Sequence, residues 1–279
     1  MDIRQRIIKL RKRLTRNFKC LDGRVVQFKK VNLEWWKHKH NVGDEISTII
    51  CDYMLARRGL SFDSPAKRTK HLMAVGSICG EGRIDATVWG SGIHSQALKD
   101  NILRYKKYRK LDIRAVRGPE TENFLNENGI KCPKIYGDPA IIMPLIYQPE
   151  VKKKYPLSFV VHVLMKNKVN ISEGIHLIDT ETADYKLFID EIAASEKVIS
   201  SSLHGIILAE SYGIPVVFLC EGVEDQIMKY KDWYLSTGRP NFTFANNLKE
   251  AMEMEPMPLP DLSSLREKLM EVFPYDLWR

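Results

Sequence analysis

The stretch Val198-Ile199-Ser200-Ser201-Ser202-Leu203-His204-Gly205-Ile206-Ile207-Leu208-Ala209-Glu210 predicts a buried strand that runs through three serines into a helix. The first turn of a helix has unpaired backbone N–H groups and a partial positive charge. A phosphate group binds well at such a position. His204 lies in this first turn, and a histidine side chain titrates near neutral pH. The segment therefore combines an anion-binding position with a proton carrier.

Short apolar segments alternate with helical patterns on both sides of this stretch. Strands are predicted at 31–36, 71–78, 85–89, 111–116, 157–164, 175–179, 197–201 and 215–220, and helices at 45–58, 120–128, 183–194, 205–212 and in the tail from 261. This alternation is typical of an α/β fold with parallel sheets. Three prolines and a run of lysines interrupt the pattern at 144–156, which indicates a linker.

We therefore expect two Rossmann-like, doubly wound domains that face each other across a cleft. Their predicted bounds are 1–148, which includes a basic N-terminal helix, and 149–279, which includes the helix at 205–212 and the tail. Ligands of such sheets bind beyond the carboxyl ends of the strands.

The composition limits the classes of protein and partner. The chain has 279 residues and a net charge of +8, which favours anionic partners. Five cysteines without C-x-x-C spacing do not predict a disulfide framework or a zinc site, so we expect a reducing compartment. No apolar run approaches the ~20 residues that span a bilayer, and no secretory signal pattern is seen. These features predict a cytoplasmic protein.

Residues 2–19 form a basic amphipathic pattern, in which eight Lys and Arg side chains surround an apolar stripe. One interpretation is a helix that lies on the anionic inner face of the cytoplasmic membrane. The alternative is a packed terminal helix with a solvated basic face. The basic clusters at 106–110 and 152–154 are not accompanied by a nucleic-acid-binding motif, so no nucleic acid partner is expected.

Three further loops carry candidate site residues. Asp44 follows Gly43 at the start of a predicted helix, where a carboxylate also serves as a helix cap. Gly90 and Gly92 permit close approach of a ligand to the backbone, as well as a tight turn. Arg117 follows a strand, and a guanidinium there can bind a carboxylate or phosphate through two parallel hydrogen bonds, or form a surface ion pair.

The histidines have simpler alternatives. His204 itself can be a structural histidine, and His162 is predicted inside a core strand, where a packed or hydrogen-bonded role is expected. His38 and His40 are expected in a loop without a third ligand nearby, so no metal site is predicted.

Taken together, these loops resemble the polysaccharide pyruvyl transferase family. The matching elements follow the family's order over about residues 30–220: Asn41-x-Gly43-Asp44-Glu45, Trp89-Gly90-Ser91-Gly92, Val116-Arg117-Gly118-Pro119-Glu120-Thr121, Gly137-Asp138-Pro139-Ala140, and Ser201-Ser202-Leu203-His204-Gly205 followed by Ala209-Glu210 and Gly213-Ile214-Pro215. Trp35-Trp36 ahead of the first loop resembles the bacterial exopolysaccharide branch.

The resemblance implies a glycosyltransferase-B-like fold and phosphoenolpyruvate as donor. It implies metal-independent transfer of the pyruvyl group, usually as a ketal, to a sugar of a lipid-linked saccharide. Asp44, Arg117, Leu203 and His204 match positions that serve the donor site. Ser202 departs from the family, because many members have Arg there; the missing cation would be supplied from elsewhere, for example by Arg114.

A mechanism follows as a hypothesis. Arg117 would bind the donor carboxylate, and backbone N–H groups near Ser201, Ser202 and Gly205 would hold the phosphate. His204 would donate a proton or neutralise the leaving phosphate, while Asp44 would accept a proton from the acceptor hydroxyl.

Two other functions remain open at this point. One is a nucleotide-sugar-dependent glycosyltransferase of the same architecture, with Glu210 binding a ribose. The other is a non-catalytic protein that binds anionic glycolipid at the membrane through residues 2–19.

Overall fold

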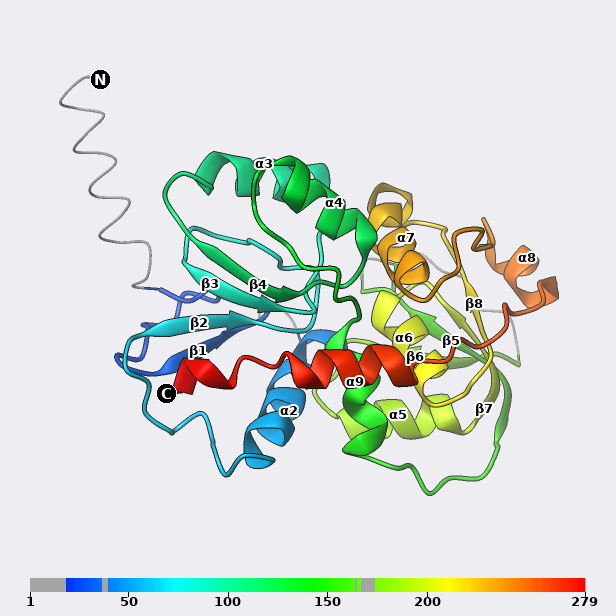
Figure 1. Ribbon diagram of the computed structural model, residues 1–279. Coiled ribbons are helices and arrows are strands. Elements are labelled where there is room, and N and C mark those ends of the chain that lie inside the picture. Colours follow the sequence, from blue (N-terminus) through cyan, green and yellow to red (C-terminus); the bar gives the residue numbers. More distant parts are fainter. Residues whose placement is uncertain (1–18, 37–39, 164, 167–173, 279) are drawn as a thin grey trace.

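The computed structural model describes residues 19–36, 40–163, 165–166 and 174–278. Two parallel four-stranded sheets lie side by side, each with its own helices (Figure 1). Residues 2–18 of the predicted basic helix lie outside the described residues, as does His38.

The first sheet contains β1 (Val31–Glu34), β2 (Lys70–Met73), β3 (Ala86–Trp89) and β4 (Leu111–Ala115) in the order β1-β2-β3-β4. Its helices are α2 (Val42–Ala56), α3 (Gln96–Tyr105) and α4 (Pro119–Glu127). The strands and helices α2 and α4 were predicted, whereas α3 was not. Ser95 is the missed signal, because its side chain caps α3 by accepting a hydrogen bond from the Leu98 N–H.

The second sheet contains β5 (Tyr155–Val161), β6 (His176–Asp179), β7 (Ser195–Ser200) and β8 (Val216–Phe218) in the order β6-β5-β7-β8. Helices α5 (Tyr185–Ala193) and α6 (Leu203–Ser211) follow β6 and β7. The strand order reverses at β5, which creates the switch point where open α/β sheets bind ligands. The doubly wound order predicted for both halves is therefore present in the second sheet. In the first sheet, the described strands instead lie in the order in which they occur in the chain, because each new strand is added on the same side of the preceding one.

A short 3-10 helix, η1 (Pro139–Leu145), joins the two halves through an apolar core. Residues 139–143 are buried, and η1 packs against both α2 and α6. One cluster of buried apolar residues extends without a break from β1 through η1 to α6. The predicted linker at 144–156 thus begins inside a packed helix, and residues 148–154 form its irregular, mostly exposed part.

The C-terminal part of the chain contains η2 (Glu224–Gln226), α7 (Ile227–Ser236), α8 (Leu248–Glu253), α9 (Ser263–Glu271) and η3 (Tyr275–Trp278). Helix α9 and η3 run from the second half back to the first (Figure 1). The Trp89 indole N–H donates to the Leu269 carbonyl at 2.8 Å, and the Tyr275 hydroxyl donates to the Met54 carbonyl at 2.8 Å. The tail therefore packs back on the body, as expected, and its hydrogen bonds reach the first half.

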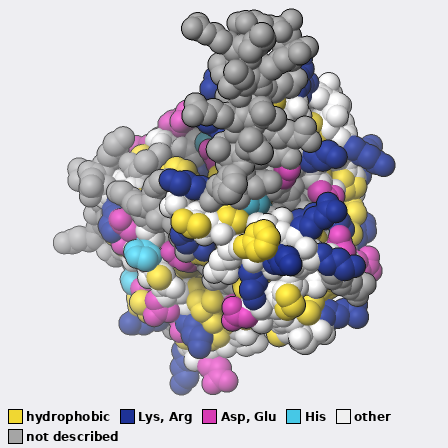
Figure 2. All heavy atoms as spheres, turned by 90° about the vertical axis from the view of Figure 1, so that its left-hand side faces the viewer, with side chains coloured by type: hydrophobic (Ala, Val, Ile, Leu, Met, Phe, Trp, Pro, Cys, Tyr) yellow, Lys and Arg dark blue, Asp and Glu magenta, His cyan; other side chains and the backbone are white. Residues whose placement is uncertain are grey.

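The surface of the first half carries mixed charge. Figure 2 shows Lys and Arg side chains spread among acidic and apolar ones over this face. Such a pattern is ordinary for a solvated surface. In the described part of the chain, no helix has the length and apolar character that crossing a bilayer requires.

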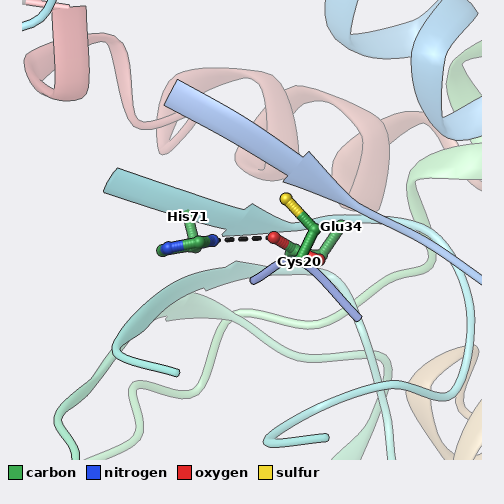
Figure 3. Close-up of side chains that lie close together, drawn as sticks. All are labelled: Cys20, Glu34 and His71. Carbon is green, nitrogen blue, oxygen red and sulfur yellow. Dashed lines mark hydrogen bonds and ion pairs between the residues drawn. The ribbon is translucent and has the colours of Figure 1, made fainter. Parts of the chain in front are cut away.

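A buried carboxylate fixes the first described residues to the sheet. Glu34 on β1 accepts hydrogen bonds from His71 Nδ1 at 2.7 Å and from the Leu21 N–H at 2.7 Å, and the Cys20 thiol lies beside it (Figure 3). Burial raises the pKa of Cys20 to about 12, with the Glu34 charge adding to the effect, so the thiol stays protonated.

We predict that Glu34→Leu lowers the free energy of unfolding by about 3 kcal/mol, because it leaves the buried His71 donor and the partly buried Leu21 N–H without an acceptor. Urea unfolding measures the change. Glu127→Leu, at an exposed position on α4, is the control and should change stability little. An unchanged unfolding midpoint for Glu34→Leu would show that the carboxylate is not a structural anchor.

Candidate active site

A pocket of about 300 Å³ lies where loops from the two sheets meet. It is lined by the start of α2, the loop after β2, the ends of β5 and β6, the start of α6, and α7: Trp36, Asn41, Asp44, Ser77, Ile78, Glu81, His94, His162, Val163, Thr180, Ser202, Leu203, His204, Gln226 and Lys229. The pocket thus lies beyond the carboxyl ends of strands from both halves. It includes the reversal of strand order between β5 and β7, where a ligand site is expected.

Helix α6 begins very close to the strands beneath it. A Cβ atom on Gly205 would lie 2.4 Å from Ser200 Oγ and 2.6 Å from Val160 Cγ1, so only glycine fits there. The N–H groups of Ser201 and Ser202 already donate to the Val160 carbonyl and to Ser200 Oγ. Among the described residues, none accepts a hydrogen bond from the N–H groups of Leu203, His204 or Gly205. Of the N–H groups predicted to bind an anion, those of Ser201 and Ser202 are thus engaged, whereas that of Gly205 has no described acceptor.

His204 is held between two loops of the first half. Its ring packs on Gly43, since a Cβ atom there would lie only 1.9 Å from His204 Nδ1. Its Nε2 lies 3.7 Å from Asp138 Oδ2, and neither of these buried atoms has a hydrogen-bond partner among the described residues. Asp138 is fixed by the Ala140 N–H, which donates to its other oxygen. Sequence reasoning placed Asp138 in a motif and gave it no role.

Asp44 is a buried carboxylate in the first turn of α2. Asn41 caps this helix by accepting a hydrogen bond from the Gly43 N–H. Burial raises the pKa of Asp44 to about 6, although the charges of His204 and Lys229 act in the opposite direction. A carboxylate with a pKa close to the working pH is suited to general base catalysis.

Lys229 and His162 complete the pocket. The Lys229 Nζ donates to Gln226 Oε1 at 2.6 Å and lies 3.4 Å from His162 Nε2. Burial lowers the pKa of Lys229 to about 7, and burial together with the Lys229 charge lowers that of His162 to about 3. His162 is thus neutral and accepts from the ammonium group. Sequence reasoning predicted a packed or hydrogen-bonded role for His162, which the contact with Lys229 fits. It missed Lys229, because no helix was predicted around that residue.

Arg117 lies directly behind the pocket wall. It is fully buried and donates to Ser77 Oγ at 2.6 Å and to the Ile93 carbonyl at 2.7 Å. Its guanidinium also lies 3.2 Å from Asp232 on α7. Ser77 lines the pocket and Arg117 does not. Direct contact of Arg117 with a donor remains a prediction.

The predicted glycines support these side chains. A Cβ atom on Gly92 would lie 2.4 Å from the Arg117 guanidinium carbon. Gly90 has a φ of +85°, which favours glycine, and packs on Pro139. Arg114 lies elsewhere: its guanidinium binds Asp112 and Asp276, beside a separate cavity under the C-terminal tail. The structure therefore places four of the predicted site residues in the lining of one pocket: Asp44, Ser202, Leu203 and His204. Ser201, Gly205, Arg117, Gly90 and Gly92 do not line it. Arg114 lies at a different cavity.

In the part of the chain that the structure describes, one group of side chains has the donor atoms for a metal ion. Cys20, Glu34 and His71 bring one such atom each within 4.8 Å of the others (Figure 3), and none of the three lines the pocket. Both Glu34 oxygens already accept hydrogen bonds there. These contacts fit a hydrogen-bonded structural cluster.

The family model of the polysaccharide pyruvyl transferases matches residues 83–219. Residues 83–219 are therefore similar to the polysaccharide pyruvyl transferase domain. The resemblance seen in the sequence motifs is thereby confirmed. The matched range contains Arg117, Asp138 and His204. Asp44 and Lys229 lie outside this range in the sequence, although both line the pocket.

Similar proteins include one with a named role. The chain is 26% identical over 232 residues to the succinoglycan biosynthesis protein ExoV of Rhizobium meliloti (strain 1021), covering 78% of this chain and 69% of that protein. It is 24% identical over 201 residues to the uncharacterized protein L143 of Acanthamoeba polyphaga mimivirus, covering 68% of each. A crystal structure of the functionally uncharacterized protein KP1_0663 from Klebsiella pneumoniae superposes with a TM-score of 0.49 at 14% identity, covering 88% of this chain and 100% of that one.

We predict that Asp44→Asn stabilises the protein above pH 6. Because the folded state raises the Asp44 pKa from 3.8 to about 6, the wild type binds more protons folded than unfolded between these two pH values, and its stability falls as the pH rises through this window and stays low above it. The asparagine variant should be more stable by about 3 kcal/mol at pH 7.5 and equal to the wild type near pH 4. Urea unfolding at four pH values tests this, and a pH-independent difference would contradict it.

Proposed function

We propose that this protein transfers the pyruvyl group of phosphoenolpyruvate to a saccharide used in exopolysaccharide biosynthesis, and that the product is a cyclic ketal. The main support is that Asp44 from the first half and His204 at the start of α6 line one pocket. The match to the pyruvyl transferase family model and the similarity to a succinoglycan biosynthesis protein also support this function.

The reaction has clear requirements. The methylene carbon of phosphoenolpyruvate must gain a proton, and a sugar hydroxyl must attack the central carbon and lose its own proton. Phosphate then leaves, and a second hydroxyl closes the ring with loss of another proton. The products are one ketal and one inorganic phosphate. The site must therefore hold an anion, supply an acid and supply a base.

The pocket residues match these requirements. The free N–H groups in the first turn of α6 bind the phosphate. His204, with Asp138 opposite its Nε2, donates the proton or neutralises the leaving phosphate. Asp44 takes the proton of the attacking hydroxyl. Arg117 adds positive charge from behind Ser77. Burial is the main cause of the lowered pKa values of His94 and Lys229, and the Arg117 charge adds to both shifts.

A second cavity of about 530 Å³ is the proposed acceptor site. It shares Trp36, Glu81 and His94 with the first pocket and continues along α3 past Asp100 and Arg104. Trp36 is about half exposed, so its ring can cover a sugar face while charged side chains bind hydroxyl groups. An acceptor there would lie next to the donor.

The structure weakens the nucleotide-sugar alternative. The carboxylate of Glu210 accepts hydrogen bonds from Arg239 at 2.6 and 2.9 Å and from the Trp233 indole at 2.8 Å. It is therefore engaged in the core of the second half and away from the pocket lining. The membrane-surface role of residues 2–19, and with it a peripheral location on the cytoplasmic membrane, rests on the sequence pattern.

We predict that the purified protein releases phosphate from phosphoenolpyruvate when a suitable member of a panel of pyranosides is added. Carbon NMR of the product should show a ketal carbon and its methyl group. A nucleotide sugar should give neither product nor a rise in melting temperature. Glycosyl transfer from the nucleotide sugar would refute the proposal.

We predict that His204→Ala lowers kcat by about 10²- to 10⁴-fold, because it removes the proposed acid. The protein should remain folded, as judged by its circular dichroism spectrum. His176→Ala is the matched control, since His176 lies at the opposite end of β6 from the pocket and binds Glu191. Equal activity of the His204 variant and the control would remove His204 from the mechanism.

A further inference from the structure

We propose that Lys229 is the donor-binding cation of this pocket, and that it makes the site selective for a small anionic donor over a neutral one. The inference rests on the proposed function and names a residue that neither the motifs nor the matched domain range includes.

Lys229 is the only Lys or Arg among the described residues that line the pocket. The other ionisable lining groups are two carboxylates, Asp44 and Glu81, and three histidines. Without Lys229 the pocket would present more negative than positive charge to an anion, and Coulomb repulsion would oppose binding. The pocket therefore depends on this ammonium group for its attraction to anions.

The ammonium group of Lys229 is buried with neutral partners. Its two described hydrogen-bond partners are an amide oxygen of Gln226 and a ring nitrogen of His162. None of the ion pairs found between described residues involves Lys229. A buried ammonium is costly unless a counter-charge accompanies it. An anionic ligand would supply that counter-charge and accept the third N–H of the group.

Helix α7 is anchored so that Lys229 stays at the pocket. Three residues after Lys229, Asp232 accepts hydrogen bonds from the Thr121 N–H at 3.1 Å and from the Thr121 hydroxyl at 2.7 Å, and pairs with Arg117. Between them, the Tyr230 hydroxyl donates to the Ser201 carbonyl at 2.6 Å. The helix is thus fixed to the first half and to the loop before α6. Lys229 is preorganised, which lowers the entropic cost of binding.

Ser202 offers a position at which the charge can be restored. It lines the same pocket, and its side chain makes no capping hydrogen bond to α6. An arginine at this position would bring a guanidinium into the pocket without breaking a described side-chain hydrogen bond. The double variant Lys229→Met with Ser202→Arg therefore tests charge in the pocket separately from the lysine itself.

The experiment measures the dissociation constant of phosphoenolpyruvate by calorimetry for four proteins. Lys229→Met should weaken binding about 10- to 100-fold, as expected for loss of a charge-assisted hydrogen bond. The double variant should recover at least fivefold. Lys231→Met is the control, because Lys231 lies on the same helix, is exposed and pairs with Glu120; its affinity should equal that of the wild type. Lys229→Gln replaces the methionine variant if the latter does not fold.

Two further probes separate the possible failures. Inorganic phosphate and pyruvate, measured with the same variants, show which anionic group Lys229 binds. If the wild type binds phosphoenolpyruvate and Lys229→Met binds it equally, the inference is wrong while the proposed function stands. If the wild type does not bind phosphoenolpyruvate, the proposed function fails. The inference is then decided by inorganic phosphate, and equal phosphate binding in the wild type and Lys229→Met would overturn it.

Discussion

A buried ion pair between Arg117 and Asp232 connects the two halves at the site. Both side chains are fully buried, so loss of either one would leave an uncompensated charge at a cost of about 3–5 kcal/mol. Ser77 Oγ and the Ile93 carbonyl accept hydrogen bonds from Arg117, and the Thr121 hydroxyl donates to Asp232, while Arg117 Nε has no partner among the described residues. The pair fixes helix α7 relative to the loop after β2. The positions of Lys229 and Ser77 in the pocket depend on it.

Glycines make this arrangement possible by letting side chains from one half approach the backbone of another segment. Gly43 leaves room for the His204 ring, Gly92 for the Arg117 guanidinium, and Gly118 for the backbone oxygen of Asp232. A Cβ atom at any of these positions would lie within 2.4 Å of its neighbour, closer than packed atoms approach. The glycines of the sequence motifs are therefore explained by packing around functional side chains, and direct ligand contact is not needed to account for them.

The sequence predicted those features that depend on local signals. Alternating apolar segments located the eight strands of the described residues, and the strand–serine–helix transition located His204 in the first turn of a helix. Asp44 was found because it follows a glycine at a helix start. Lys229 was missed because its role depends on α7 reaching the pocket from far along the chain. The position of Arg114 was also not predictable from local sequence. Its place on a strand does not show that its side chain faces the C-terminal tail and Asp276. The order of the first sheet also depends on long-range packing.

The path of the chain restricts how the molecule can move. The chain passes between the halves through η1 and returns through the segment before α9, and the apolar core continues across the junction. Opening the halves like a clamshell would expose that core and pull the tail from Trp89 and Met54. The continuous core and the tail contacts therefore oppose such an opening, so access to the pocket depends on its rim.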